Sequence, residues 1–195
     1  MGAAAAQMKS CVHIIGGHWK RSLLPAPSLS GVRPTPARVR ETVFNWLGQR
    51  LEGYTCVDLF AGSGALGFEA ASRGAARVTL VERHPRLVRQ LRQTQAKLDA
   101  RAIEIVRSDA MQFLTACAPQ RFDIVFVDPP FNSALIERVL PLCRARARPE
   151  GVIYIESPKA LRLFDAHCFG DWRIDRQGRA GAVHYALLRQ EVRNS

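Results

Sequence analysis

Hydrophobic positions follow two alternating patterns along residues 53–195. Short runs of apolar and β-branched residues are typical of strands buried on both faces of a parallel sheet, and the longer stretches between them favour helices. The strand pattern covers residues 54–60, 77–82, 103–106, 122–127 and 152–156. The helix pattern covers residues 64–74, 85–100, 110–117 and 133–147, with Asp109 as an expected N-cap. This alternation predicts an α/β fold, with a mostly parallel sheet and helices on both of its faces.

The two ends of the chain depart from this alternation. Residues 172–176 and 182–188 predict two strands joined as a hairpin through Gly178 and Gly181, which adds antiparallel pairing and brings the sheet to seven strands. The first 52 residues are basic, rich in Gly and Pro, and end in a helix. We therefore predict two parts, a basic N-terminal extension over residues 1–52 and an α/β domain over residues 53–195.

The net charge of the chain indicates which class of partner it binds. The chain has 195 residues, 47% of them hydrophobic, as is typical of a globular protein, and a formal net charge of +11. Such an excess indicates a polyanionic partner, above all nucleic acid, although an Arg-rich proteome also produces basic chains. The distribution favours a partner, because the first fifty positions hold a single acidic residue, Glu41, against seven basic ones: Lys9, Lys20, Arg21, Arg33, Arg38, Arg40 and Arg50.

The cysteines indicate the compartment. They are widely spaced and form no CxxC pair: Cys11, Cys56, Cys117, Cys143 and Cys168. This spacing argues against a zinc site or a disulfide framework and predicts a reducing, cytoplasmic location. No apolar run approaches the roughly 20 residues of a membrane span, so no membrane partner is expected.

The most informative motif is Asp128-Pro129-Pro130-Phe131, which directly follows the expected strand 122–127. Two prolines donate no backbone hydrogen bonds and fix φ near −65°, so the chain leaves the sheet stiffly at a strand's carboxyl end, where open α/β sheets place ligands. The turn offers an acidic side chain, a proline carbonyl and a flat aromatic ring, which suit an exocyclic amine on a planar base. An ordinary strand-ending turn is an equally weighted reading of these four residues alone.

A second motif lies in the first strand-to-helix turn, where residues 62–67 read GxGxxG. Glycines there allow a tight turn and a close approach of the backbone to a ligand, and Glu82 ends the next strand, where a carboxylate accepts ribose hydroxyls. A nicotinamide-dependent oxidoreductase therefore competes. Asp58 weakens that reading, because an anion there repels a pyrophosphate but suits an ammonium or sulfonium ligand.

Taken in order, these motifs resemble those of class I methyltransferases that use S-adenosylmethionine (SAM). Residues 58–67 resemble the methionine-binding loop, Glu82 the ribose-binding acid, residues 108–110 the adenine-contacting segment, and the Asp128 turn the amine-methylating motif. The resemblance implies a Rossmann-like fold and SAM as cofactor. It implies that the following residues bind the cofactor: Thr35, Asp58, Phe60, Ala61, Gly62, Ser63, Gly64, Glu82, Arg83, Asp109 and Ala110.

The N-terminal residues extend this resemblance. Residues 14–17, Trp19, residues 24–25, 33–35 and 38–47 resemble the signature of the RsmD-type enzymes, which are bacterial 16S rRNA guanine-N2 methyltransferases. An Ala-rich tail and His18, where a basic residue is common, are small departures. The resemblance implies 16S rRNA as the partner, within a 30S subunit or an assembly intermediate, and a reaction that needs no metal.

Site roles follow from the same resemblance. The expected catalytic residues are Asp128, Pro129, Pro130 and Phe131. The expected RNA contacts are Gly17, Trp19, Lys20, Arg21, Arg33 and Arg38. For Arg38, Arg40 and Glu41, salt bridges on an amphipathic helix are the competing reading, which we expect to hold for at least one of the arginines.

Three alternatives remain open from the sequence. The same turn serves methyltransferases of DNA adenine N6 and of glutamine amides, but those usually carry a recognition insert, for which 195 residues leave no room. A nicotinamide-dependent oxidoreductase is the second, and an RNA-binding module with an inactive Rossmann core is the third.

Overall fold

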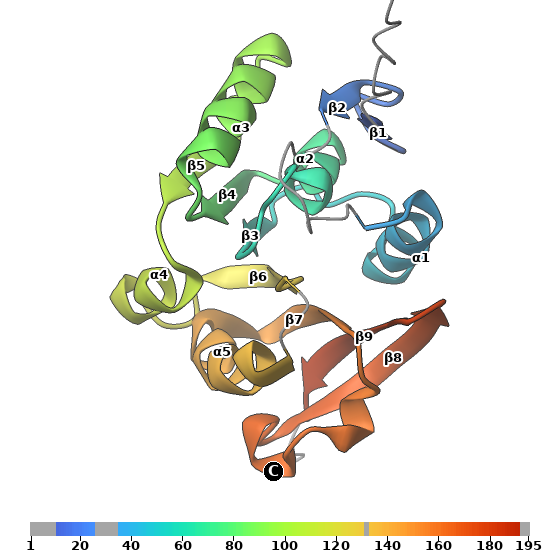
Figure 1. Ribbon diagram of the computed structural model, residues 1–195, viewed down its shortest axis with the longest axis vertical. Coiled ribbons are helices and arrows are strands. Elements are labelled where there is room, and N and C mark those ends of the chain that lie inside the picture. The colour runs from blue at the N-terminus through green and yellow to red at the C-terminus, as the bar shows by residue number, and fades with distance from the viewer. Residues whose placement is uncertain (1–10, 26–34, 131–132, 192–195) are drawn as a thin grey trace, which may run out of the picture.

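The computed structural model describes residues 11–25, 35–130 and 133–191 (Figure 1). Their main feature is a seven-stranded sheet with the strand order β5-β4-β3-β6-β7-β9-β8. The strands are β3 (Thr55–Asp58), β4 (Arg77–Glu82), β5 (Ile103–Arg107), β6 (Phe122–Val127), β7 (Ala147–Ser157), β8 (Trp172–Ala180) and β9 (Val183–Gln190). Strands β3 to β7 pair in parallel, while β9 pairs antiparallel with both β7 and β8. The predicted α/β fold with its closing hairpin is confirmed.

Helices cover both faces of this sheet. They are α1 (Ala37–Leu47), α2 (Ala65–Ser72), α3 (Pro85–Lys97), α4 (Ala110–Ala116) and α5 (Ser133–Arg146), followed by the short 3₁₀ turns η1 (Leu161–Leu163) and η2 (Ala166–Cys168). Figure 1 shows α1 and α2 on one side of the sheet and α4 and α5 on the other. The buried residue Leu91 of α3 joins the same core cluster as α1 and α2.

Strand β6 shows why an unbroken apolar run predicts a central strand. Ile124 and Phe126 are fully buried in the core under α1 and α2, while Val125 and Val127 are fully buried in the core under α4 and α5. Because successive side chains point to opposite faces, a strand covered on both sides needs apolar residues at every position.

The C-terminal hairpin differs in detail from the prediction. Strand β8 continues to Ala180, so Gly178 lies inside the strand, and its expected place in the turn is wrong. A Cβ on Gly178 would lie 2.5 Å from the ring of Tyr185, so the missing side chain makes room for that ring. The turn itself falls at Gly181, whose φ of 60° favours glycine.

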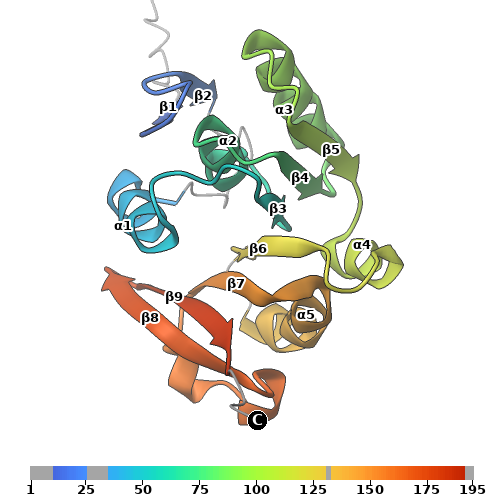
Figure 2. The same cartoon turned by 180° about the vertical axis from the view of Figure 1, so that it is seen from behind.

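A second, two-stranded sheet was not expected from the sequence. Strands β1 (Cys11–His13) and β2 (Leu23–Pro25) pair antiparallel, and Figure 2 shows them beside α2. Each has only three residues, too few for a strand pattern to emerge among the surrounding Gly and Pro residues.

One buried carboxylate holds this N-terminal segment against the sheet domain. Glu69 on α2 is fully buried and accepts hydrogen bonds from the backbone N–H groups of Ile15 (2.7 Å) and Gly16 (2.8 Å). It also forms ion pairs with Arg40 of α1 (3.3 Å) and with Arg73 (2.8 Å). Arg40 is itself buried, so one of the arginines does form a salt bridge, but with Glu69 of another helix and not along the surface of its own helix as expected.

We predict that Glu69→Gln lowers the free energy of unfolding by about 3 kcal/mol or more, because it leaves two buried guanidinium groups without a counter-charge. Urea denaturation followed by circular dichroism measures this. The matched control is Glu52→Gln, which breaks the exposed pair with Arg50 and should change the free energy by less than about 0.5 kcal/mol. Equal effects of the two substitutions would contradict the role of Glu69.

Candidate active site at the carboxyl edge of the sheet

Four acidic side chains gather at one edge of the sheet. Because β3 to β7 run parallel, their carboxyl ends meet there, and Asp58, Glu82, Asp128 and Glu156 lie at or next to the ends of β3, β4, β6 and β7. The chain builds β4 and β5 on one side of β3 and then returns to build β6 on the other side. Asp58 and Asp128 thus flank the point where strand order reverses, which is where open α/β sheets bind ligands.

The loop after β3 is held between two of these carboxylates. Asp58 is buried and accepts a hydrogen bond from the N–H of Gly67 at 3.2 Å. Glu82 accepts from the N–H of Gly62 at 3.0 Å and from the N–H of His84 at 2.8 Å. Gly64 has a φ of 78°, and a Cβ there would lie 2.6 Å from Phe68, so the turn requires glycine.

Burial raises the pKa of Asp58 to about 7, and the charges of Glu82 and Glu156 add to this shift. The hydrogen bonds from Gly67 and Phe60 oppose it without cancelling it. Among the described residues, no cationic side chain forms an ion pair with Asp58. A ligand ammonium or sulfonium would therefore favour the ionised carboxylate and gain from doing so.

The other predicted cofactor residues lie along the same edge. Ala61, Ser63 and Ala110 are buried, Phe60 is half-buried and Arg83 is exposed. Asp109 caps α4 by accepting from the N–H of Met111 at 2.9 Å, as predicted. Met111 and Gln112 both donate to Oδ1 of this half-buried carboxylate, which leaves Oδ2 for an amine.

Asp128 lies in a cluster with a second carboxyl. Thr35 donates through Oγ1 to Asp128 Oδ2 at 3.1 Å, and the charge of Glu156, next to the end of β7, acts on the same carboxyl. Tyr154 donates its hydroxyl to Glu156 Oε1 at 2.8 Å. Thr35, Tyr154 and Glu156 are buried and Asp128 is half-buried, so the bond between Tyr154 and Glu156 forms away from water.

This arrangement raises the proton affinity of both Asp128 and Glu156. Burial raises the pKa of Asp128 well above its ordinary value, and the charges of Glu156 and Asp58 raise it further, against the opposing hydrogen bond from Thr35. Burial also raises the pKa of Glu156, although Tyr154, Thr35 and Arg40 favour its ionised form. A carboxylate whose pKa is raised accepts hydrogen bonds strongly and takes up a proton more readily than an ordinary aspartate does.

Sequence reasoning missed Glu156, Tyr154 and the linking role of Arg40. Glu156 ends a strand as Asp58 and Glu82 do, and that repeated signal could have identified it. Arg40 donates to the carbonyl of Thr35 at 3.3 Å and to the carbonyl of His13 at 2.9 Å. Arg40 thereby connects the anchored N-terminal segment to the residue that bonds Asp128.

The structure describes only part of the rest of the predicted catalytic turn. Pro129 is buried and Pro130 is exposed, consistent with a turn that leaves the sheet at its edge. Phe131, expected to stack on a base, and Arg33, expected to contact RNA, lie outside the described residues.

The structure does not bring all expected RNA contacts to this edge. Helix α2 starts at the edge and runs about 12 Å away from it, at 1.5 Å per residue. Trp19 donates its N–H to Ser72 Oγ at 2.9 Å, and a Cβ on Gly17 would lie 1.8 Å from the carbonyl oxygen of Ser72. Gly17, Trp19 and the exposed Lys20 and Arg21 thus lie at the far end of α2.

Arg38 lies closer to the catalytic turn. It is exposed on the first turn of α1, three residues after Thr35. Its place in the chain is compatible with the expected RNA contact, which stays a prediction.

Two further classes of feature were searched for in the described ranges. None of the helices there has the length and apolarity needed to cross a membrane. The same ranges contain no group of three or more His, Cys, Asp or Glu side chains placed to hold a metal ion.

Comparisons with known proteins cover nearly the whole chain. Residues 12–189 match the family described as "Conserved hypothetical protein 95". The chain is 42% identical over 183 residues to Ribosomal RNA small subunit methyltransferase D of Escherichia coli K12, covering 93% of this chain and 91% of that protein. It is 37% identical over 184 residues to the protein of the same name from Haemophilus influenzae, covering 92% and 94%. The solved structure titled "Putative methyltransferase yhhF from Escherichia coli" matches with a TM-score of 0.80 and 41% identity, covering 94% of this chain and all of that one.

Proposed function

The chain belongs to the family described as Conserved hypothetical protein 95, and from this membership we infer that it is a methyltransferase of small-subunit ribosomal RNA with SAM as its methyl donor. We propose further that the acceptor is the exocyclic N2 amine of a guanine. The observation that carries this proposal is the position of Asp128, which lies beside Asp58 at the point where strand order reverses and accepts a hydrogen bond from Thr35.

The residues at the carboxyl edge fit SAM. Asp58 would hold the ammonium of the methionine part, because a cation offsets the cost of ionising this buried carboxyl. Glu82 is fixed by the N–H groups of Gly62 and His84, and each oxygen keeps a lone pair for a ribose hydroxyl. Asp109 would accept the adenine amine through Oδ2. When bound, SAM supplies an electrophilic methyl group on a sulfonium.

The catalytic turn would act on the amine. A guanine N2 amine is a poor nucleophile because its lone pair is conjugated with the ring. Asp128 and the carbonyl of Pro129 would accept its two N–H groups, orient its lone pair and stabilise the positive charge that develops on nitrogen. As the N–C bond forms and the C–S bond breaks, the proton lost by the nitrogen would pass to Asp128, whose raised pKa suits this task.

The net charge of the chain bears on the kind of substrate. A net charge of +11 favours a polyanionic substrate. We place the reaction on the 30S subunit or an assembly intermediate in the cytoplasm. The relatives that cover most of this chain bear methyltransferase names, so the nicotinamide-dependent reading gains no support, and no inserted recognition region favours a DNA substrate.

We predict that Asp128→Asn lowers kcat by roughly 100- to 1000-fold while the Kd for SAM stays within about threefold. Transfer of radiolabelled methyl groups to 30S particles that lack the modification measures the rate, and calorimetry measures the affinity. The matched control is Asp175→Asn on β8. It removes one partner of the exposed ion pair with Arg189 and should leave both the kcat and the Kd for SAM unchanged.

Two outcomes would contradict the proposed function. If Asp128→Asn does not slow transfer, the turn does not handle the amine. If mass mapping of the modified nucleotide places the methyl group on an atom other than guanine N2, the acceptor is wrong.

A second prediction concerns Glu156, which faces Asp128, Asp58, Tyr154 and Arg40. Its negative charge raises the pKa of Asp128, so Glu156→Gln should lower that pKa and keep Asp128 ionised in more acidic solution. We expect the acidic limb of the single-turnover rate to move to lower pH. The control Glu150→Gln, exposed at the start of β7, should not move it. A uniform loss of rate with an unmoved limb would show that Glu156 acts only on structure.

A further inference from the structure

Helix α3 carries positive charge that nothing on the helix neutralises. Arg86, Arg89, Arg92 and Lys97 are its only charged residues, and no acidic residue occurs between Arg83 and Leu98. Cations three residues apart on a helix repel one another, and Arg86 also lies in the first turn, where the helix dipole disfavours a cation. Such a helix is less stable alone than one with mixed charge, and an anionic ligand would remove the repulsion.

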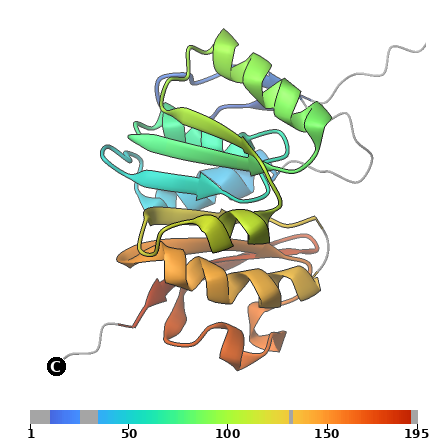
Figure 3. The same cartoon turned by 90° about the vertical axis from the view of Figure 1, so that its left-hand side faces the viewer.

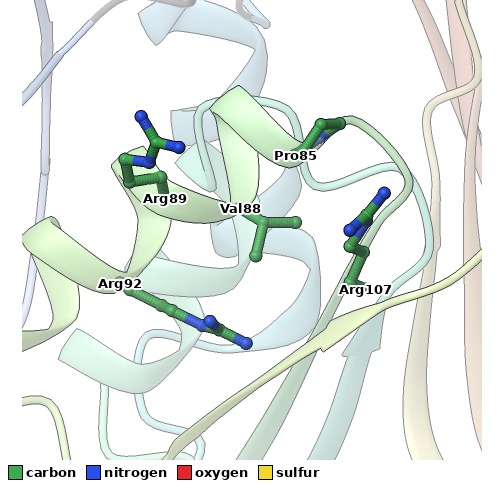
Figure 4. A pocket seen from close by; sticks show the side chains of 5 residues that line it. All are labelled: Pro85, Val88, Arg89, Arg92 and Arg107. Atoms are coloured by element: carbon green, nitrogen blue, oxygen red, sulfur yellow. The ribbon is translucent and has the colours of Figure 1, made fainter.

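Two of these arginines converge with a third from β5. Arg89 and Arg92 line a hollow of about 320 Å³ together with Arg107, and Pro85 and Val88 contribute its apolar surface. Figure 4 shows Val88 between Arg92 and Arg107, which extend from α3 and β5. Three guanidinium groups beside a small apolar surface suit a phosphate and its attached sugar.

The residues that line the hollow include no acidic side chain. The carboxylate of Glu82, in register with Arg107 on the same face of the sheet, accepts from the N–H groups of Gly62 and His84. In the parts of the chain that the structure describes, Arg89, Arg92 and Arg107 take part in no ion pair. Glu104 on β5 does not supply a counter-charge, because Arg107 shares a face with Ile103 and Ile105, which belong to the core under α3, while Glu104 alternates to the other face.

The surface continues beyond this hollow. Arg92 also lines a second hollow of about 220 Å³ that reaches Arg101 at the end of α3. Its one carboxylate, Asp99, is paired with Arg101 at 3.1 Å. The two hollows together follow the helix, as an extended polyanion would require.

The first hollow lies near the same edge of the sheet as the candidate active site. Arg107 is in register with Glu82, and Pro85 starts α3 just after β4, so the hollow opens near the carboxyl edge that holds Asp128. Strand β5 is three strands from β6, or about 14 Å at 4.8 Å per strand. Figure 3 shows α3 beside β5 at the opposite end of the sheet from β8, so a long ligand can continue past this edge.

We propose that the hollow formed by Arg89, Arg92 and Arg107 binds backbone phosphates of the substrate RNA a few nucleotides from the target base. This inference rests on the proposed function for the identity of the RNA. It differs from the expected contacts at Lys20 and Arg21, which lie at the far end of α2 from the catalytic edge. Phosphate contacts there would fix the register of the strand and leave base recognition to the catalytic turn.

The test is the triple variant Arg89→Gln, Arg92→Gln, Arg107→Gln. Binding to unmodified 16S rRNA, measured by filter retention without methyl transfer, should weaken roughly tenfold or more at moderate salt. The slope of log K against log salt should become shallower by about 2, at 0.7 per lost phosphate contact. The Kd for SAM and kcat at saturating RNA should stay within about twofold, because the hollow does not touch the reacting groups.

The matched control removes three exposed arginines at the other end of the molecule, Arg162→Gln, Arg176→Gln and Arg179→Gln. The proposal is supported if the first variant loses affinity and slope while the control keeps both. It is overturned if the two variants lose affinity equally, since bulk charge then explains binding, or if the first variant binds as the parent does. These readouts do not use methyl transfer, so a parent enzyme that fails to methylate rRNA would refute the proposed function separately.

Discussion

A carboxylate with no access to water must be surrounded by donors, and in this protein that requirement fixes the relation between the N-terminal segment and the sheet domain. Glu69 receives two backbone N–H groups from residues 15–16 and two guanidinium groups, from Arg40 and Arg73. These donors come from residues 15–16, α1 and the end of α2, so the movement of any one segment leaves the buried carboxylate with fewer partners. Residues 11–25 are therefore part of the folded core. A contact with RNA would be an additional role of this segment.

This anchoring extends to the chemistry. Arg40 also donates to the carbonyls of His13 and Thr35, and the Thr35 hydroxyl donates to Asp128. The turn that would hold the amine is thus braced by a residue that lies 93 positions earlier in the chain. The same cluster brings Glu156 beside Asp128, and the resulting repulsion, added to burial, raises the pKa of the Asp128 carboxyl. Packing and proton affinity are set by one connected group of side chains.

Features that depend on a local residue pattern were predicted correctly from the sequence. Strands β4 and β6 have the expected bounds, because apolar runs covered on both faces leave little freedom, and Asp109 caps α4 because its side chain reaches its own backbone. Features that depend on distant partners were missed. Strand β7 starts five residues early because Ala147 pairs with Phe122, and β1 and β2 are too short to show a pattern. Arg40 matters because it pairs with Glu69 and donates to Thr35, and Glu156 because it lies near Asp128. Position 17 needs glycine because it lies in close contact with Ser72.

The central claim is that this braced carboxyl faces the reacting methyl group. A crystal structure of the protein with S-adenosylhomocysteine tests it most directly. The account predicts that the ligand's ammonium lies within hydrogen-bond distance of Asp58, and that its sulfur faces Asp128 while Thr35 still bonds that carboxyl. A ligand bound elsewhere, or an Asp128 carboxyl turned away from the sulfur, would contradict it.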